Sequence, residues 1–588
     1  MERPPTGQVG PPEDLPPPPR DTDVEPPAPE PAPEGARRTV PAEQPAGWRA
    51  ASAWVAAHRR PALAASVLAL LLGVTVAAAA ILRGSTVHLL ARVPSGVDAV
   101  VVLHLDPSAA QKLNLARIRS SFPQVDGDQE LLARLRALGD ELFAGTGIGG
   151  GDLLGWVGPE VVAAVDVAEG EGRSALLVAV ADETGARTML AKLQAPGAAW
   201  EGVGWSERVR QGVEIRVPDR AGVPAYAFDR DALILASDAA FLEAVIDTTR
   251  ELRPSILRDV GYLEMESALP DGRLVSAYAD LRAIVEGDGP RDDLAALSDG
   301  DLGAVDGLGL SVSAEPGGLA VDVAARIDRA ALSQAALASI DAPEAPNELL
   351  GLVPAEALGV VSLRHVDVMA EVALGELVAA SPRQAPALER LGLTGEDGFL
   401  ARLTGDVAIE AVREDDGLAG AAVLGVHDPP AAARDLERLL GRVAQPDPRG
   451  GVGRDLVWRT ATIEGVRVRV SREPVVAIAA TEAAVVVATT PAHAAVIARA
   501  RGPSIVASDA FVRATAGLPS DDGMVFVDVQ AVARAVRDGL GADERERFDE
   551  VVMPWLRSIR AVAFGAGSAG TLQRARLLIQ VASPGGPG

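Results

Sequence analysis

Two histidine–aspartate pairs are the residues whose types and spacing best suit metal chemistry. His104 lies two residues before Asp106, and His365 lies two residues before Asp367. Residues two apart in a strand share a face, so each pair could offer an imidazole and a carboxylate to one ion. A metal site usually needs three or four protein ligands, and no third ligand can be named. We favour partly buried histidines at strand ends and predict no metal site.

Ser568 is the candidate nucleophile. Residues 566–570 read Ala-Gly-Ser-Ala-Gly and miss the GxSxG nucleophile elbow by their first residue. An elbow joins a strand to a helix, whereas this segment is expected at the turn of a terminal hairpin. We predict no catalytic residue and no enzyme activity. A hydrolase with an unrecognised site, using Ser568, His104 and Asp106, is kept as an alternative.

Two loop motifs match ligand-binding signatures poorly. Residues 145–150 fit GxGxxG, but a helix is expected at residues 129–143, where a dinucleotide fold needs a strand. Residues 126–130 resemble the start of a calcium loop, but Leu131 and Ala137 stand where glycine and glutamate are required. Residues 299–301 fail the same test. We predict ordinary loops and no cofactor.

The elements that must position these residues occur twice along the chain. Residues 91–111 resemble residues 351–371, and similar segments follow in the same order at a spacing of roughly 250–260 residues. The matched segments are 212–217 with 465–470, 233–237 with 485–489, 239–251 with 491–501, 255–256 with 504–505, 275–281 with 525–529, and 307–327 with 561–581. We therefore predict two repeats, residues 91–340 and 348–583, packed as two lobes about a pseudo-twofold with a cleft between them.

Each repeat combines strands and helices. Alternating or continuous apolar β-branched runs, such as residues 100–105 and 175–181, predict strands. Long hairpins such as residues 466–489 require antiparallel pairing. Asp106-Pro107-Ser108 predicts a helix start with Asp106 as N-cap, and Trp156 is expected to anchor a loop on the core. The predicted class is α+β: antiparallel sheets with helices on one face.

A run of 22 residues without charge, from Pro61 to Leu82, predicts a single transmembrane helix. Five arginines precede it within residues 37–60, whereas Arg83 and Arg92 are the nearest basic residues after it. The positive-inside rule then predicts a cytoplasmic N-terminus and an extracytoplasmic C-terminal domain. A cleaved signal peptide is the alternative, but its apolar core would be shorter and its leader would not be 60 residues long.

Composition limits the partners. Residues 1–60 are rich in proline, which predicts a disordered cytoplasmic tail, a spacer or a docking segment with Thr6, Thr22 or Thr39 as phosphate acceptors. The chain carries 81 acidic and 55 basic residues and no cysteine. A net charge of −26 repels phosphate backbones, so we expect no nucleic-acid partner.

The region from Val93 resembles a family of bacterial membrane-anchored proteins catalogued as domain of unknown function 3352. The resemblance rests on Pro94 followed by Asp106-Pro107-Ser108-Ala109, on Phe122-Pro123, and on Trp156-Val157-Gly158. It covers most of residues 91–583. His104 departs from the pattern, and so does the second half, which lacks the proline and serine after Asp367. The resemblance implies a disordered leader, one anchor and this architecture, and it implies no activity.

Together these patterns predict a single-pass protein of the bacterial inner membrane. Its duplicated extracytoplasmic domain is expected to act as a binding or scaffolding module in the cell envelope, with an envelope protein or lipid as partner. A carrier or sensor of an apolar envelope ligand is the alternative, because the strands are apolar and two lobes would form a cleft.

Overall fold

The computed structural model describes residues 88–122, 152, 155–167, 172–286, 303–341, 345–395, 398–415, 417–443, 456–472, 475–500, 502–520, 522–569 and 571–582, all within one compact unit. The predicted tail at residues 1–60 and the predicted membrane helix at residues 61–82 lie outside them. In the part of the chain that is described, no helix is both long and apolar enough to cross a bilayer.

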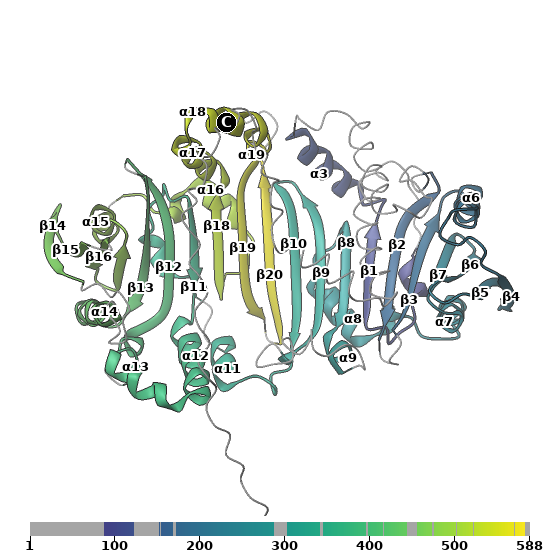
Figure 1. The fold of residues 1–588 in the computed structure, drawn as a ribbon, viewed down its shortest axis with the longest axis horizontal. Coiled ribbons are helices and arrows are strands. Elements are labelled where there is room, and N and C mark those ends of the chain that lie inside the picture. The colour runs from purple at the N-terminus through teal and green to yellow at the C-terminus, as the bar shows by residue number, and fades with distance from the viewer. Residues whose placement is uncertain are drawn as a thin grey trace, which may run out of the picture. The chain divides into compact units, whose positions relative to one another are not determined.

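The described part of the first half forms ten strands, which can be followed in Figure 1. They are β1 (Ala99–His104), β2 (Val157–Asp166), β3 (Arg173–Val180), β4 (Trp205–Arg210), β5 (Val213–Pro218), β6 (Ala225–Asp229), β7 (Ala232–Ala236), β8 (Val275–Asp280), β9 (Val305–Glu315) and β10 (Gly318–Ile327). Its helices are η1 (Leu89–Arg92), α3 (Ala109–Ser120), α6 (Glu183–Leu193), α7 (Ala239–Thr249), η2 (Ile256–Arg258), α8 (Val260–Ala268), α9 (Leu281–Glu286) and α11 (Gln334–Ile340).

The second half repeats this order. Its strands are β11 (Gly359–Leu363), β12 (Leu403–Glu414), β13 (Gly417–Val426), β14 (Trp458–Ile463), β15 (Val466–Arg472), β16 (Val475–Ala480), β17 (Ala484–Ala488), β18 (Gly523–Asp528), β19 (Ile559–Ala569) and β20 (Leu572–Val581). Its helices are η4 (Glu348–Gly351), α12 (Val366–Ala380), η5 (Pro382–Gln384), α13 (Ala385–Leu391), η6 (Leu400–Arg402), α14 (Pro429–Val443), α15 (Pro491–Arg499), η7 (Ile505–Ala507), α16 (Asp509–Thr515), α17 (Val529–Gly539), α18 (Ala542–Val551) and α19 (Met553–Leu556).

The twenty strands of the described residues form one sheet, and every pairing in it is antiparallel. The pairings run β4-β5-β6-β7-β3-β2-β1-β8-β9-β10, continue from β10 to β20, and run back through β19-β18-β11-β12-β13-β17-β16-β15-β14. The second series repeats the first with each strand number raised by ten. This equivalence is what the repeated segments of the sequence indicate.

The halves join through β10 and β20, where a cleft between two lobes was expected. Asp322 is paired with Arg576 at the middle of the antiparallel ladder, and Gly318 and Arg326 are paired with Gln580 and Leu572 near its ends. Since β10 is the counterpart of β20, the pairing is self-complementary and places the pseudo-twofold relation at the Asp322–Arg576 pair. Hydrogen-bonded strands therefore occupy the boundary between the halves.

The core lies on both sides of the sheet. On one side, which we call the helical face, α7 and α8 cover the first half and α15 and α16 cover the second. On the opposite face, α6 packs on β1, β2, β3 and β7, and α14 packs on β16 and β17. A fully buried side chain such as Leu242 of α7 stabilises the fold by about 2 kcal/mol.

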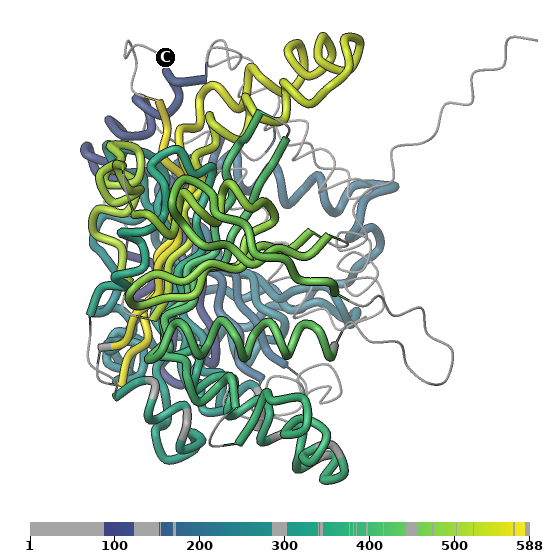
Figure 2. The backbone as a smooth tube through the Cα atoms, turned by 90° about the vertical axis from the view of Figure 1, so that its left-hand side faces the viewer, coloured from purple at the N-terminus to yellow at the C-terminus, as the bar shows by residue number. Residues whose placement is uncertain are grey.

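Four further helices lie beyond the strand ends. Figures 1 and 2 both show α12 and α13 at one end of the strands and α17 and α18 at the other. The two views therefore agree that these helices are not a layer over the middle of the sheet.

The start of α3 differs from the expectation. Its N-cap is Ser108, whose hydroxyl accepts the Gln111 N–H at 3.4 Å, whereas Asp106 was expected to cap it. The reason is that Asp106 still belongs to the sheet edge: its N–H donates to the Pro159 carbonyl at 3.2 Å, and its carboxylate forms a salt bridge with Lys112.

Candidate functional site

The structure does not place His104 and Asp106 on one strand face. His104 is the last residue of β1, and Asp106 follows it in a bend. The register pairs His104 with Glu160 of β2. Burial, followed by the nearby Arg273 guanidinium, lowers the pKa of His104. Burial raises the pKa of Glu160, whose carboxylate accepts the N–H of Leu89 at 2.6 Å.

The second pair is arranged differently, so the expectation that the two pairs are equivalent is wrong. The register makes Arg364 the counterpart of His104 and Asp406 the counterpart of Glu160. Arg364 Nε and Asp406 Oδ1 are 3.2 Å apart. His365 is the N-cap of α12 with φ of 55°, and Asp367 lies in the first turn of that helix. Within the described residues, no group of three histidine, cysteine, aspartate or glutamate side chains is arranged to hold a metal ion.

Ser568 lies near the end of β19 in the β19–β20 hairpin. Its hydroxyl donates to Asp522 Oδ2 at 2.9 Å and accepts from Gln573 Nε2 at 2.7 Å. The motifs at residues 126–130, 145–150 and 299–301 lie outside the described residues. Trp156 is 3 % exposed and packs in the core under α6, as expected for a loop anchor.

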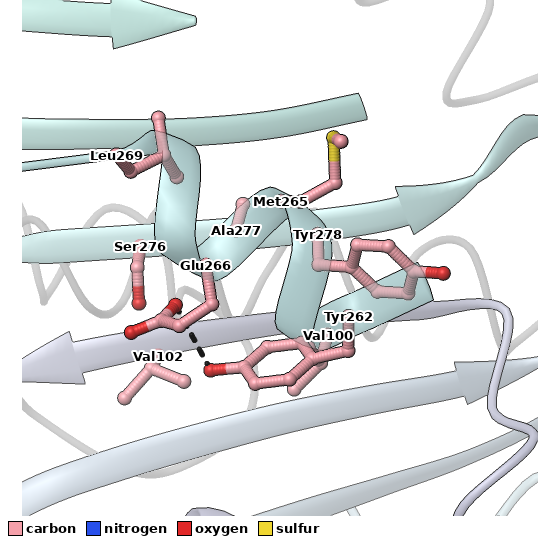
Figure 3. Close-up of a pocket in the computed structure, with 9 residues that line it drawn as sticks. All are labelled: Val100, Val102, Tyr262, Met265, Glu266, Leu269, Ser276, Ala277 and Tyr278. Carbon is pink, nitrogen blue, oxygen red and sulfur yellow. Dashed lines mark hydrogen bonds between the residues drawn. The ribbon is translucent and has the colours of Figure 1, made fainter. Parts of the chain in front are cut away.

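A small cavity lies inside the first half, between α8 and strands β1 and β8. Its walls are Val100, Val102, Tyr262, Met265, Glu266, Leu269, Ser276, Ala277 and Tyr278. The centre of a water molecule can move within about 10 Å³ of this cavity. One bound water needs about this much space. Figure 3 shows the Tyr262 hydroxyl pointing at the Glu266 carboxylate; the oxygens are 3.1 Å apart.

Glu266 is shared by two partners at this cavity. Arg273 Nη1 donates to Glu266 Oε2 at 2.6 Å, and Arg273 also donates to backbone carbonyl groups of α8 and the loop after it. Burial raises the pKa of Tyr262, and it raises the pKa of Tyr278 to about 12. Both phenols therefore stay protonated at neutral pH, and the Tyr262 hydroxyl donates to Glu266.

The second half fills the equivalent place with apolar side chains. The register makes Phe526 the counterpart of Tyr278 and Met524 the counterpart of Ser276. The Tyr262–Tyr278 and Phe511–Phe526 ring pairs have the same edge-to-face geometry, with centroids 5.6 and 5.2 Å apart. The cavity with its polar wall is therefore a feature of the first half, and its size suits a bound water better than an organic ligand.

A much larger apolar area lies on the face opposite α8 and α16. We call it the central apolar surface and define it by two rows of cross-strand partners. The first row is Val275, Val312, Val321, Leu577, Phe564, Val525, Val361 and Ile409; the second is Ala277, Leu310, Val323, Ala575 and Ala566. None of these side chains is charged. Phe564 is 37 % exposed, Ile409 is 46 % exposed, and the others are half-buried.

This surface lies between the areas that α6 and α14 cover. In Figure 1 no described helix crosses in front of β20, β10 and β9. Successive side chains of a strand point to opposite faces, and the alternation here is sharp. In β10, Val321 and Val323 belong to the surface, whereas Asp322 lies on the helical face. A continuous apolar area that remains partly open is typical of a binding surface.

The central apolar surface has a polar border at one point. Period two along β19 puts Ser568 on the same face as Phe564 and Ala566, and Gln573 is its cross-strand partner. The counterparts of Ser568 and Gln573 in the β9–β10 hairpin are Ala314 and Leu319. The Ser568–Gln573–Asp522 cluster therefore borders the apolar area in the second half only.

Ser568 is a candidate residue in the sequence, but the apolar surface beside it could not be predicted there. The alternating pattern of β9, β10, β19 and β20 is visible in the sequence and fixes which side chains share a face. It does not indicate that β10 pairs with β20, and this pairing is what brings the two halves' apolar rows together.

Comparison with known proteins identifies a family. A family model described as protein of unknown function (DUF3352) matches residues 63–581. No curated protein matches the chain. Among solved structures, crystal form III of TP0453 is similar at 10% identity and a TM-score of 0.24, over 44% of this chain and 87% of that one. Crystal form IV of TP0453 has 10% identity and a TM-score of 0.23, over 41% of this chain and 81% of that one. Crystal form I has 10% identity and a TM-score of 0.23, over 43% of this chain and 83% of that one. TM-scores this low do not establish a shared fold.

Proposed function

We propose that this chain, which belongs to the family described as protein of unknown function (DUF3352), is a membrane-anchored binding module of the bacterial cell envelope. Residues 61–82 would cross the inner membrane once, with the N-terminus in the cytoplasm. The first described residue, His88, comes only six positions after Leu82. A linker this short would keep the domain within about 20 Å of the bilayer.

The ligand we propose is a lipid acyl chain held on the central apolar surface. From Val275 on β8 to Ile409 on β12 the first row crosses eight adjacent strands. At about 4.8 Å between strands, the row is roughly 34 Å long. One leaflet of hydrocarbon is about 15 Å thick, so the row is long enough for an extended acyl chain. This uncharged, partly open row is the observation that carries the proposal.

The composition of the surface favours lipid over protein. Protein interfaces are enriched in tyrosine, tryptophan, arginine and methionine at their centres. The two rows contain valine, leucine, isoleucine, alanine and a single aromatic residue, Phe564. The Ser568–Gln573–Asp522 cluster at the border would meet the polar group of an amphipathic ligand. Its Ser568 hydroxyl lies 2.9 Å from the Asp522 carboxylate and 2.7 Å from the Gln573 amide.

Photo-crosslinking tests the proposal in cells that express the full-length chain. A photoreactive phenylalanine analogue replaces Phe564 on the surface, and a control chain carries it at Val512 of α16, which is 52 % exposed on the helical face. We expect a lipid adduct from position 564 and none from position 512. Adducts from position 564 that contain only protein, a second copy included, would overturn the choice of ligand. Equal lipid capture at both positions would overturn the choice of site.

A further inference from the structure

The second half contains an ionisable pair inside an otherwise apolar core. His493 Nε2, in the first turn of α15, is hydrogen-bonded to Glu410 Oε1 on β12. The exposed fractions of the two side chains are 4 % and 0 %. The cross-strand partners of Glu410 are Val360 and Ala421. Its second oxygen, Oε2, is buried and has no hydrogen-bond partner in the described part of the chain.

One further carboxylate lies near the pair. Glu414 Oε1 is 3.9 Å from His493 Nδ1, and Glu414 is 30 % exposed. The Thr490 hydroxyl donates to Glu414 and also caps α15 by accepting the N–H of His493 at 3.1 Å. Glu414 is therefore partly solvated and already hydrogen-bonded to Thr490. It does not share the proton that lies between Glu410 and His493.

The strands packed against α15 add little charge. These strands are β13, β14, β15, β16 and β17. Their residues facing the helix include Ala421, Val423, Val468, Ala477, Ala479 and Val486, which are buried. Arg459 of β14 is on this face and exposed, and Arg499 pairs with Glu464 at the far end of α15.

The first half provides a natural comparison without ionisable groups. The register makes Ala164 of β2 the counterpart of Glu410, since they pair with Val100 and Val360. Phe241 of α7 corresponds to His493, because the side chains of Asp238 and Thr490 accept their N–H groups at the starts of α7 and α15. Both Ala164 and Phe241 are buried. An apolar pair is thus sufficient to dock this helix on this sheet.

We propose that Glu410 and His493 form a buried proton-binding site that makes the docking of α15 depend on pH. The pair holds one proton, either as an ion pair or as two neutral groups. A second proton leaves an imidazolium facing a neutral acid, and loss of the first leaves a carboxylate facing a neutral imidazole. Either state buries an uncompensated charge among valine and alanine side chains, which favours release of the helix.

Hydrogen exchange of the full-length chain in detergent micelles tests this site. Protection of residues 491–499 of α15 is compared with protection of residues 239–249 of α7 between about pH 8 and pH 5, after correction for intrinsic exchange rates. One linked proton changes an opening equilibrium by up to about tenfold per pH unit. The closed pair keeps one proton, whereas a solvated imidazole loses its proton above about pH 6.5. We therefore expect α15 to gain protection relative to α7 as the pH falls from about 8 to about 6.5, with a slope approaching that limit, and to change little from there to about pH 5.

Three variants decide the assignment. The double variant Glu410→Ala with His493→Phe introduces the residues of the first half and should make α15 follow α7 at every pH. Glu410→Gln keeps the side-chain shape if the double variant fails to fold. It leaves a buried neutral imidazole that binds a proton only after opening, so protection of α15 should be constant above about pH 6.5 and should fall below that pH. Glu414→Gln is the matched control and should leave the slope unchanged. A constant α15-to-α7 ratio in the unmodified chain would overturn the proposal. So would a gain of protection between about pH 8 and 6.5 that survives in Glu410→Gln or disappears in Glu414→Gln.

Discussion

Asp322 of β10 and Arg576 of β20 face each other at the centre of the join between the two halves, with 3.7 Å between Asp322 Oδ1 and Arg576 Nε. They occupy equivalent positions in the two repeats, so the pseudo-twofold relation brings an acid opposite a base. Arg576 also forms a salt bridge with Glu315. Burial raises the pKa of Asp322 and lowers the pKa of Arg576. Burying either charged side chain without the other therefore costs free energy.

A double-mutant cycle on this pair should show coupling. We expect Asp322→Leu and Arg576→Leu each to destabilise the chain, and the double variant to be less destabilised than the sum by about 1 kcal/mol. The reason is that each single change leaves one member of the Asp322–Arg576 pair without the other, whereas the double change removes both. Chemical denaturation of the four proteins measures the coupling. Strict additivity would mean that the two side chains do not interact.

The same join requires glycine at position 318. Gly318 has φ of 156°, and a Cβ there would lie 1.9 Å from the carbonyl oxygen of Ile579 in β20. Gly318→Ala should therefore weaken the β10–β20 pairing and cost about 3 kcal/mol or more. Gly317→Ala is the matched control, because nothing lies within 4 Å of a Cβ at that neighbouring position. Equal melting temperatures for the two variants would contradict the tight approach of the strands.

The buried groups near β1 and β2 predict opposite pH dependences. Burial lowers the pKa of His104 from 6.5, so below about pH 6.5 the unfolded chain takes up a proton that the folded chain resists. His104→Gln should then reduce the stability lost on acidification below that pH.

Burial raises the pKa of Glu160 from 4.5, so stability falls as the pH rises from about 4.5 to the folded pKa. Glu160→Gln should reduce that second loss while keeping an acceptor for the Leu89 N–H. Urea denaturation at closely spaced pH values measures both slopes. If the two variants changed the pH profile in the same direction, burial could not be the common cause.

Substitutions on the two faces of the sheet should differ in their effects on stability and on lipid binding. Leu578 on the helical face is 7 % exposed, whereas Phe564 on the central apolar surface is 37 % exposed. Leu578→Ala should cost about 3 kcal/mol because it leaves a cavity, and Phe564→Ala should cost about 1 kcal/mol because solvent already reaches the ring. Only Phe564→Ala should also reduce lipid bound per folded molecule. A larger unfolding penalty for Phe564→Ala would show that the ring belongs to a closed core.

The absence of cysteine makes membrane topology directly measurable. Thr6→Cys and Val512→Cys each introduce a single thiol into the full-length chain. In intact spheroplasts, a membrane-impermeant maleimide should label the chain at position 512, which is 52 % exposed, and label it at position 6 only after permeabilisation. The reverse pattern would invert the proposed orientation, and labelling of both sites before permeabilisation would exclude a single crossing.

The elements that occur in both halves could be predicted from the sequence. The counterparts Ser255 and Ser504 each precede a short 3-10 helix and bridge to Pro94 and Pro354. A hairpin pairs strands that are close in sequence, and apolar and polar residues alternate along each strand. This alternation therefore predicts hairpins well. The β10–β20 pairing joins residues about 250 positions apart and depends on the fit of two exposed strand edges, for which neither strand carries a separate signal.

The candidate sites were harder to predict for the same reason. His104 and His365 looked equivalent because each precedes an aspartate by two residues, yet the register shifts the second pair by one position and makes Arg364 the counterpart of His104. Glu410 and His493 are 83 positions apart, and only the packing of α15 on the sheet brings them together. Burial of these groups follows from tertiary packing, which spacing along the chain does not specify.

An experimental structure of the full-length chain, extracted with its surrounding lipid in polymer-bounded nanodiscs, tests the central claim most directly. We expect elongated acyl-chain density along Val321, Leu577 and Phe564, with its polar end at Ser568 and Gln573. Density of another protein segment or of a second copy on those three side chains, or an empty surface in contact with water, would contradict it.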